Sequence, residues 1–359
     1  MSSQFRWKTA AGTLAIATVG GFLASLAGLP LPWLIGAQIA LCIVALMRID
    51  IFGAPPQWPR ASRDLFLPVL GVMIGTSFSA EVLEGIPQWW PSLLALSAFI
   101  VVVHGIVFFI FRRIGGYDNA TAFFASFPGG FVEATILGEE AGGNQQVIVI
   151  QHFLRISLIV FLVPLIFWAV SGTVVGSAAG VTMGGVTGPA RPVDFAVLAV
   201  AGVVGTLVAR RLRLPAKDIS GAIAASAFVH IMGWADGALP PALIALTQLM
   251  IGTALGVGFT GVSRSEILRA TGLAFLAFGL VFLGAVGCGY FLQDLTGTSL
   301  EALILSFAPG GLAEMSLIAL SLHLSVPFVT LHHLYRIFFT VAVLPQLYRL
   351  IERGGAPEA

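Results

Sequence analysis

Charged residues are scarce in this chain. Asp, Glu, Lys and Arg make up 10% of its 359 residues, whereas a soluble domain carries about a quarter. So few charges cannot solvate the surface of a folded chain of this length, which excludes a water-soluble globular protein. The formal net charge of +1 also provides no basic surface for nucleic acid.

Metal and thiol ligands are also few. The two cysteines, Cys42 and Cys288, lie in apolar segments, and the six histidines are scattered apart from the neighbours His332 and His333. A copper oxygenase needs clustered ligands. We therefore expect no bound metal, no cofactor and no enzymatic activity.

Apolar residues, in contrast, make up 57% of the chain. Several of their runs approach the ~20 residues that a helix needs to cross a ~30 Å hydrocarbon core. The sequence therefore predicts an all-α polytopic membrane protein whose main partner is the lipid bilayer. The twelve expected segments are 8–28, 31–48, 64–80, 90–111, 119–140, 147–170, 193–210, 218–235, 240–259, 267–292, 300–321 and 326–348.

The two halves of the chain repeat each other. Matches of glycine, proline and charged residues recur at constant spacing, which shared hydrophobicity does not explain. We therefore expect a first membrane repeat at 1–170, a linker at 171–192 and a second repeat at 193–359. At a spacing of 181 residues the matches include Pro128/Pro309, Gly129/Gly310, Gly130/Gly311, Glu133/Glu314, His152/His333 and Arg155/Arg336, and at 185 residues they include Gly20/Gly205, Pro30/Pro215 and Gly36/Gly221.

The basic residues predict the orientation, because Lys and Arg collect in cytoplasmic loops. They favour cytoplasmic N- and C-termini in a bacterial inner membrane, with Glu81 and Glu84 on the outside. This requires an odd number of crossings in the first half and therefore two inverted repeats. The residues assigned to the inside are Arg6, Lys8, Arg48, Arg60, Arg63, Arg112, Arg113, Arg210, Arg211, Arg213, Lys217, Arg264, Arg269, Arg349 and Arg353.

One segment of each half is interrupted by Pro-Gly-Gly. Residues 119–127 form about nine residues of helix, or ~14 Å, which is half the depth of the hydrocarbon core. The parity of crossings favours a re-entrant hairpin here and at 300–321, giving five transmembrane helices and one hairpin in each half. A discontinuous helix that crosses the membrane is the alternative.

The two breaks are the candidate binding site. Irregular backbone at membrane depth is tolerated only where protein buries it or water reaches it, and each restarted helix presents free N–H groups that suit an anion. Ser126 and Ser306 add hydroxyl groups close to the two tips. The candidate substrate-binding residues are Ser126, Pro128, Gly129, Gly130, Glu133, Pro309, Gly310, Gly311 and Glu314.

Glu133 and Glu314 lie in the first turn after the breaks. They either complement the positive ends of their helices or bind a coupling proton or cation. The pairs His152/Arg155 and His333/Arg336 are three residues apart, so each pair shares a helix face. All six are candidates for coupling or gating.

The arginines allow two interpretations. Arg155 with Glu133, and Arg336 with Glu314, would form ion pairs that lock each hairpin to the following helix, or the arginines would contact substrate. The histidines either carry protons, because histidine titrates near neutral pH, or make packing hydrogen bonds. The pairs Gly71/Gly75 and Gly252/Gly256 are typical of close helix packing.

These motifs resemble the membrane AbrB duplication family. Phe127–Glu133 with His152–Arg155, and Ala308–Glu314 with His333–Arg336, carry the resemblance, which extends over nearly the whole chain. Members have been labelled ammonia monooxygenases or AbrB-type regulators. The family in turn resembles the superfamily of cation/proton antiporters and anion transporters. This kinship implies a moving core from segments four to six of each half, a scaffold from segments one to three, and a homodimer through the scaffold.

The leading hypothesis is a secondary transporter of a small organic anion or amino-acid-like solute, coupled to H⁺ or Na⁺. It depends on the inverted repeats, the paired breaks and the paired charges within the membrane. A membrane-embedded sensor, which binds a ligand without moving it, is the second hypothesis. A membrane oxygenase is the third, and the sparse metal ligands count against it.

Overall fold

The computed structural model describes residues 5–29, 31–171, 191–235, 239–261 and 264–355. Helices make up 79% of the described residues, which contain no strand, and this confirms the all-α prediction. Residues 172–190 of the predicted linker lie outside the described residues.

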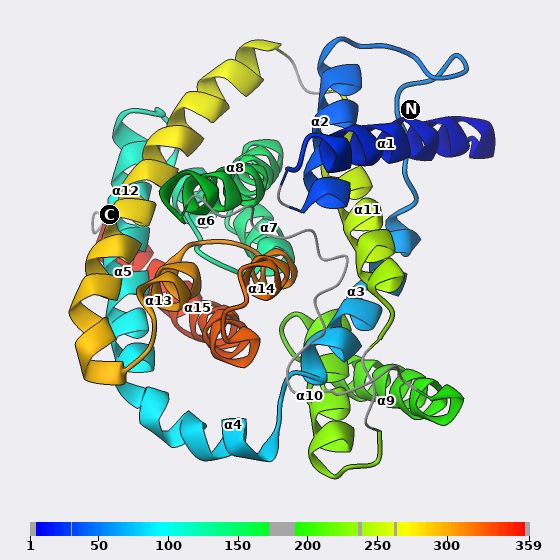
Figure 1. Cartoon of the computed structure of the whole chain (residues 1–359). Coiled ribbons are helices and arrows are strands. Elements are labelled where there is room, and N and C mark those ends of the chain that lie inside the picture. Colours follow the sequence, from blue (N-terminus) through cyan, green and yellow to red (C-terminus); the bar gives the residue numbers. More distant parts are fainter. Residues whose placement is uncertain (1–4, 30, 172–190, 236–238, 262–263, 356–359) are drawn as a thin grey trace. The chain divides into compact units, whose positions relative to one another are not determined.

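The helices of the first half follow the predicted segments to within a few residues. Near the end of this half, the first Pro-Gly-Gly separates the two short helices α6 and α7 (Figure 1). In order they are α1 (Trp7–Leu26), α2 (Pro32–Leu46), α3 (Arg60–Gly75), α4 (Ala80–Gly85), the 3-10 turn η1 (Ile86–Trp89), α5 (Trp90–Arg113), α6 (Asn119–Ala125), α7 (Phe131–Glu140) and α8 (Gln145–Ser171).

The second half has the same order of elements, except that the single helix α12 stands where the first half has α4, η1 and α5. Again a broken pair, α13 and α14, stands before a long final helix. The helices are α9 (Pro192–Arg211), α10 (Lys217–Ile231), α11 (Pro241–Val257), α12 (Arg264–Thr296), α13 (Leu300–Phe307), α14 (Leu312–Ser321) and α15 (Val326–Gly355).

Six helical stretches in the described part of the chain are long and apolar enough to cross a membrane. Large apolar side chains lie on their outer surfaces: Phe291 is 88% exposed and Phe22 is 54% exposed. Such exposure is unfavourable in water and ordinary in lipid. The protein is therefore an integral membrane protein. The six stretches are 7–26, 80–113, 145–170, 192–211, 267–296 and 326–350.

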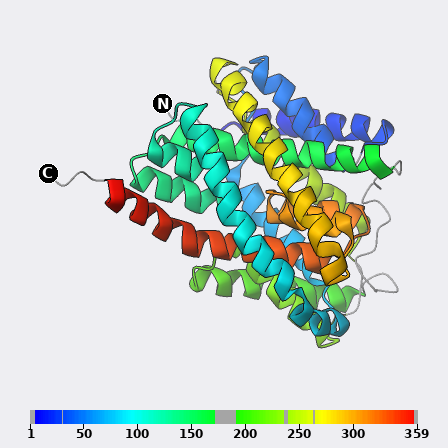
Figure 2. The ribbon, with the colours of Figure 1, turned by 90° about the vertical axis from the view of Figure 1, so that its left-hand side faces the viewer.

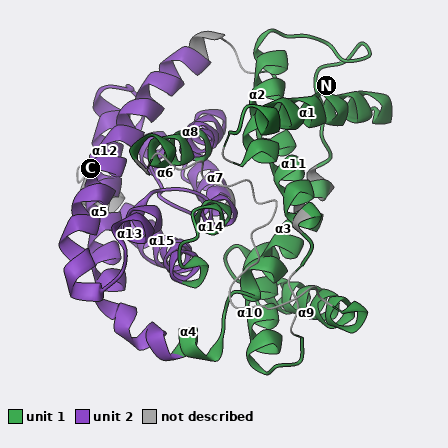
Figure 3. Cartoon of the chain, viewed as in Figure 1, with its two compact units in different colours: residues 1–83, 160–264, 316–327 green, residues 84–159, 265–315, 328–359 purple. Residues whose placement is uncertain are grey.

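The chain forms two compact units, and each unit takes helices from both halves (Figure 3). Unit 1 contains residues 1–83, 160–264 and 316–327, so it holds the first three segments of each half. Unit 2 contains residues 84–159, 265–315 and 328–359, and holds most of the last three segments of each half. This grouping is the one that the family resemblance implies, while the roles of scaffold and moving core stay predictions.

In unit 1 the repeat is visible at the level of helix packing. A Cβ atom added to Gly36 of α2 would lie 2.3 Å from the carbonyl oxygen of Gly20 in α1. At the equivalent positions of the second half, a Cβ on Gly221 of α10 would lie 2.1 Å from the carbonyl oxygen of Gly205 in α9. Only glycine permits backbones to approach so closely.

The third helix of each half packs on the second helix of the other half. A Cβ atom on Gly71 of α3 would lie 2.7 Å from the carbonyl oxygen of Ile219 in α10, and one on Gly252 of α11 would lie 2.3 Å from that of Leu34 in α2. The prediction that these glycines permit close packing is confirmed. This exchange of helices makes unit 1 a product of both halves.

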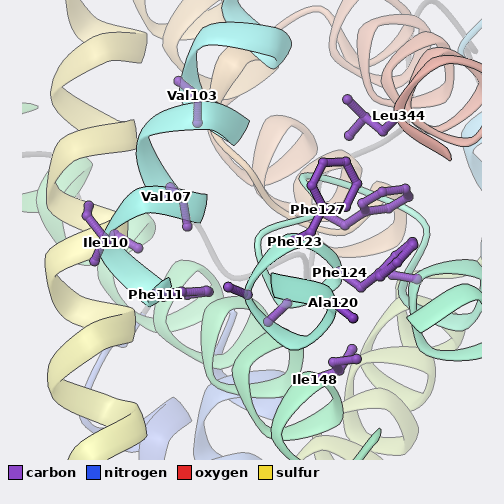
Figure 4. Packing of buried hydrophobic residues seen from close by; sticks show 14 of the residues in the cluster. Val103, Val107, Ile110, Phe111, Ala120, Phe123, Phe124, Phe127, Ile148 and Leu344 are labelled. Atoms are coloured by element: carbon purple, nitrogen blue, oxygen red, sulfur yellow. The ribbon is translucent and has the colours of Figure 1, made fainter. Parts of the chain in front are cut away.

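In unit 2 the long helices α5 and α12 cross in Figures 1 and 2 and contact each other where Phe99 meets Gly284. Its buried core joins α5 to the first broken segment, with Phe123, Phe124 and Phe127 packed between Val107 of α5 and Leu344 of α15 (Figure 4). The first break is therefore held by an aromatic cluster.

Candidate functional site

Both Pro-Gly-Gly motifs interrupt a helix, and both breaks lie in unit 2. Helix α6 ends at Ala125 and α7 begins at Phe131, while α13 ends at Phe307 and α14 begins at Leu312. Proline lacks an N–H group and cannot continue the hydrogen-bond ladder. Gly130 then starts α7 in the left-handed conformation with φ +66°, which a residue with a side chain adopts only at a cost.

The first broken segment doubles back on itself. The N–H group of Asn144, just beyond α7, donates to Thr121 Oγ1 near the start of α6 at 2.7 Å. Between these ends, a Cβ on Gly138 of α7 would lie 3.0 Å from Cβ of Phe124 in α6. The end of α7 therefore returns to the beginning of α6, and the broken segment forms a hairpin, while its entry and exit on one side of the membrane stay a prediction.

Arg155 and His152 of α8 tie this hairpin to the following helix. The guanidinium Nη1 of Arg155 donates to the carbonyl oxygen of Phe127, and its Nη2 contacts His152 Nδ1 at 3.0 Å. His152 Nε2 lies 2.9 Å from the carbonyl oxygen of Phe124. These carbonyls lie at the end of α6, where the last helical C=O groups have no partner within the helix.

The second half repeats this arrangement. Arg336 Nη1 donates to the carbonyl oxygen of Ala308 at 2.6 Å, and its Nη2 contacts His333 Nδ1 at 2.5 Å. His333 Nε2 lies 3.0 Å from the carbonyl oxygen of Leu305. Each of these contacts has its counterpart 181 residues earlier. In addition, Arg336 Nη2 donates to the carbonyl oxygen of Gly310, so the second break receives one more hydrogen bond.

Arg155 holds the hairpin through a different acceptor than the predicted Glu133. In the part of the chain that the structure describes, Arg155 has the Phe127 carbonyl and His152 as partners, and Glu133 is not among them. The ion pair between Arg155 and Glu133 is therefore wrong, whereas a lock between hairpin and helix is present. A main-chain carbonyl serves as the acceptor because the C=O groups at the end of a half-helix have no partner within the helix.

The two glutamates fold back over their own helix starts. Glu133 Oε2 would lie 3.2 Å from a Cβ on Gly130, and Glu314 Oε2 would lie 2.0 Å from a Cβ on Gly311. Each carboxylate thus lies over the positive end of its helix, as a capping group does. Glu314 is 8% exposed, so the second of these charges is buried in the protein.

The first tip packs against α15 of the second half. A Cβ on Gly129 would lie 3.5 Å from Ile337 Cγ1 and 3.8 Å from Arg336 Nε. The structure therefore brings together the tip of one hairpin and the arginine that holds the other.

A small cavity of about 30 Å³ lies beside this meeting point. Ser126 of the first break, Arg155 and Pro309 of the second break share its wall. Ser126 Oγ donates to the Phe123 carbonyl oxygen at 2.8 Å and lies 3.2 Å from His104 Nδ1. The full lining is Val107, Phe111, Ala125, Ser126, Gln151, Arg155, Ala274, Ala277, Phe278, Val281 and Pro309.

The two serines predicted to add hydroxyl groups at the breaks differ in position. Ser126 lines the cavity, but Ser306 donates to the Ala302 carbonyl oxygen of its own helix at 2.7 Å. Gln151 lines the cavity and was missed by the sequence analysis. Its position four residues before Arg155, on the same face of α8, is the signal that points to it.

The comparisons with known proteins show which family the chain is similar to. The family model described as "Transition state regulatory protein AbrB" matches residues 33–352. The chain belongs to the AbrB family. Among its relatives is the "Uncharacterized protein YhjN" of Bacillus subtilis (strain 168), which is 31% identical and aligned over 94% of this chain and 92% of its own length.

A second AbrB-family relative is the "Putative regulator AbrB" of Escherichia coli (strain K12). It is 23% identical, and the alignment covers 92% of each chain. Within the described residues of this AbrB-family chain, no group of three or more His, Cys, Asp and Glu side chains is placed to hold a metal ion.

Proposed function

We propose that the protein is a secondary-active transporter of a small solute, an organic anion or an amino-acid-like molecule, coupled to H⁺ or Na⁺. The solute binds near the membrane midplane between the two broken segments. The observation that carries the proposal is the pair of helix breaks, each held by an arginine and a histidine in the same way. Irregular backbone inside a membrane protein is typical of solute sites in transporters.

The glutamates are the proposed coupling groups. Each lies at a break, close to the backbone N–H groups that start the next helix. An ionisable group within the membrane is a functional candidate by default, and uptake of a proton or a cation at this position would change the stability of the break. The histidines and arginines would then position the breaks.

The location and assembly are proposals as well. We place the protein in a bacterial inner membrane with both termini in the cytoplasm, because basic residues favour that side, and both relatives named above are bacterial. A homodimer through unit 1 accords with the exposed apolar side chains of α9, such as Val203 and Leu207, and we expect neither nucleic acid nor a cofactor to bind.

The test is uptake into proteoliposomes under imposed proton or sodium gradients, with carboxylates and amino acids as solutes. The wild type should accumulate solute only when a gradient is present, and the double variant Glu133→Gln/Glu314→Gln should lose this accumulation. Glu81→Gln in α4 is a matched control outside the breaks and should behave as the wild type. Uptake that the double variant retains would remove the glutamates from the mechanism.

A membrane-embedded sensor is the second candidate, because the family description and one relative carry the word regulator or regulatory in their names. It predicts binding of solute at the breaks without flux under any gradient. A membrane oxygenase predicts stoichiometric copper or iron in the purified protein, which elemental analysis measures directly.

A further inference from the structure

Gln151 has an unsatisfied acceptor at the wall of the cavity. Its Nε2 donates to Tyr117 Oη at 3.0 Å and to the Ala270 carbonyl oxygen at 3.4 Å. A carbonyl oxygen only accepts hydrogen bonds, so the atom that contacts Ala270 must be the amide nitrogen. Oε1 is then the atom of the Gln151 amide that makes neither of these two contacts. Gln151 is 2% exposed, and Oε1 has no hydrogen-bond partner among the described residues.

Arg155, which also lines the cavity, has an unsatisfied donor. Both of its Nη atoms are engaged, by the Phe127 carbonyl and by His152, but its buried Nε has no partner among the described residues. Gln151 and Arg155 are four residues apart on α8 and therefore lie on one face of the helix. Two residues that line the cavity thus carry an unpaired charged donor and an unpaired neutral acceptor at neighbouring positions of one helix.

The second half of the repeat does not offer this combination. His332 stands at the position equivalent to Gln151 and is satisfied by Ser92 Oγ and by the Phe328 carbonyl oxygen, both at 2.8 Å. Arg336 Nε, like Arg155 Nε, is buried and has no hydrogen-bond partner among the described residues, so the two halves differ at the acceptor and not at the donor. The two halves have therefore diverged at one wall of the site.

We infer that the cavity receives the polar end of a small 2-hydroxy or 2-amino carboxylate. A carboxylate oxygen accepts from Arg155 Nε, and the adjacent hydroxyl or ammonium group donates to Gln151 Oε1. The volume of about 30 Å³ accommodates roughly two water-sized groups, which are these two.

The 2-substituent should determine specificity. A carboxylate without it leaves the Gln151 acceptor buried and unpaired, and sites with such groups reject analogues that cannot pair with them. We therefore expect a preference of roughly tenfold for a solute that carries the donor over one that lacks it. The inference rests on the proposed solute site at the breaks.

The experiment is equilibrium binding by titration calorimetry to the purified protein in detergent, without any gradient. The probes are two matched pairs, glycolate with acetate and lactate with propionate, in which only the hydroxyl group differs. The wild type should bind glycolate and lactate at least about tenfold more tightly than their partners. Gln151→Met should remove this preference and leave the Kd of acetate and propionate unchanged.

Gln248→Met is the matched control. Gln248 is buried in α11 of unit 1, and both of its amide atoms lack hydrogen-bond partners among the described residues, yet it does not line the cavity. It should leave the preference intact. Equal affinity of the wild type for both members of each pair overturns the inference, and this result does not depend on whether the Gln151 variant folds. A preference that survives in Gln151→Met also overturns it, as does occupation of the cavity by water alone.

Binding and flux separate the two proposals. Gradient-driven uptake of solutes without the hydroxyl preference would overturn the inference and leave the transporter standing. Hydroxyl-selective binding that Gln151→Met abolishes, in a protein that shows no uptake, would support the inference and favour the sensor.

Discussion

Arg155 Nη2 lies 3.0 Å from His152 Nδ1, and this contact determines the state of the histidine. A guanidinium group only donates hydrogen bonds, so Nδ1 accepts and carries no hydrogen. The hydrogen is then on Nε2, which donates to the Phe124 carbonyl oxygen at 2.9 Å. The imidazole is neutral in this conformation, and the same argument applies to His333.

The neutral histidines lead to a prediction about pH. Glutamine donates and accepts in the same way as this histidine tautomer but does not titrate, so the double variant His152→Gln/His333→Gln should keep the pH dependence of uptake. Proteoliposome uptake between pH 5 and about 8 measures it, the range in which an unperturbed histidine changes charge. A flattened pH profile would show instead that these histidines carry the coupled proton.

Arg336 should be essential to the fold of the second break. It is 1% exposed and bonds to the carbonyl oxygens of Ala308 and Gly310 and to His333. Arg336→Met leaves these buried acceptors unpaired, at a cost of about 1–3 kcal/mol for each. Thermal unfolding of the detergent-purified protein should show a clearly lower Tm.

Arg349→Met provides the control for this prediction. Arg349 is an exposed arginine further along α15, and a surface substitution of this kind changes stability by no more than about 0.5 kcal/mol. If both variants unfolded at the temperature of the wild type, the hydrogen bonds of Arg336 would not stabilise the break.

Gly130 should be needed for function as well as for stability. Its φ is +66°, and a Cβ would lie 3.2 Å from both Glu133 Oε2 and Val341 Cγ2. Gly130→Ala should therefore cost roughly 1–2 kcal/mol of backbone strain, displace the glutamate and abolish uptake. Thermal unfolding and proteoliposome uptake measure the two effects separately.

Gly142→Ala tests whether strain alone explains the loss. Gly142 has φ +77°, and a Cβ there would meet nothing within 4 Å. This variant should lose similar stability and retain uptake. Equal loss of uptake in both variants would mean that a general weakening of the hairpin, and not the position of Glu133, accounts for the effect.

The sequence predicted most of the fold because its strongest signals are local. The apolar segments, the breaks at Pro128 and Pro309 and the spacing of the repeat are legible without coordinates, since helix length, proline chemistry and glycine placement depend on neighbouring residues. The positions of the basic residues required an odd number of crossings in the first half, which favoured a hairpin over a crossing helix. The contact between Asn144 and Thr121 shows that this segment doubles back.

The partners of the site residues were harder to predict. Arg155 was expected to pair with Glu133 because opposite charges attract, but it bonds to the carbonyl oxygen of Phe127. Every residue has a carbonyl group, so the sequence does not mark which of them is left free at the end of a half-helix. Gln151 was missed for a related reason: an amide in an apolar helix becomes informative only when one of its atoms lacks a partner.

By itself, then, the sequence determined an all-α membrane protein of the AbrB family, duplicated and broken twice, because hydrophobicity and backbone chemistry act over a few residues. The tertiary structure decided what each polar group contacts. It exchanged helices between the halves in unit 1, set the tip at Gly129 against Arg336 and left Gln151 open where its counterpart His332 is satisfied. Those relationships join residues far apart in the chain, and only the packing of the folded helices brings them together.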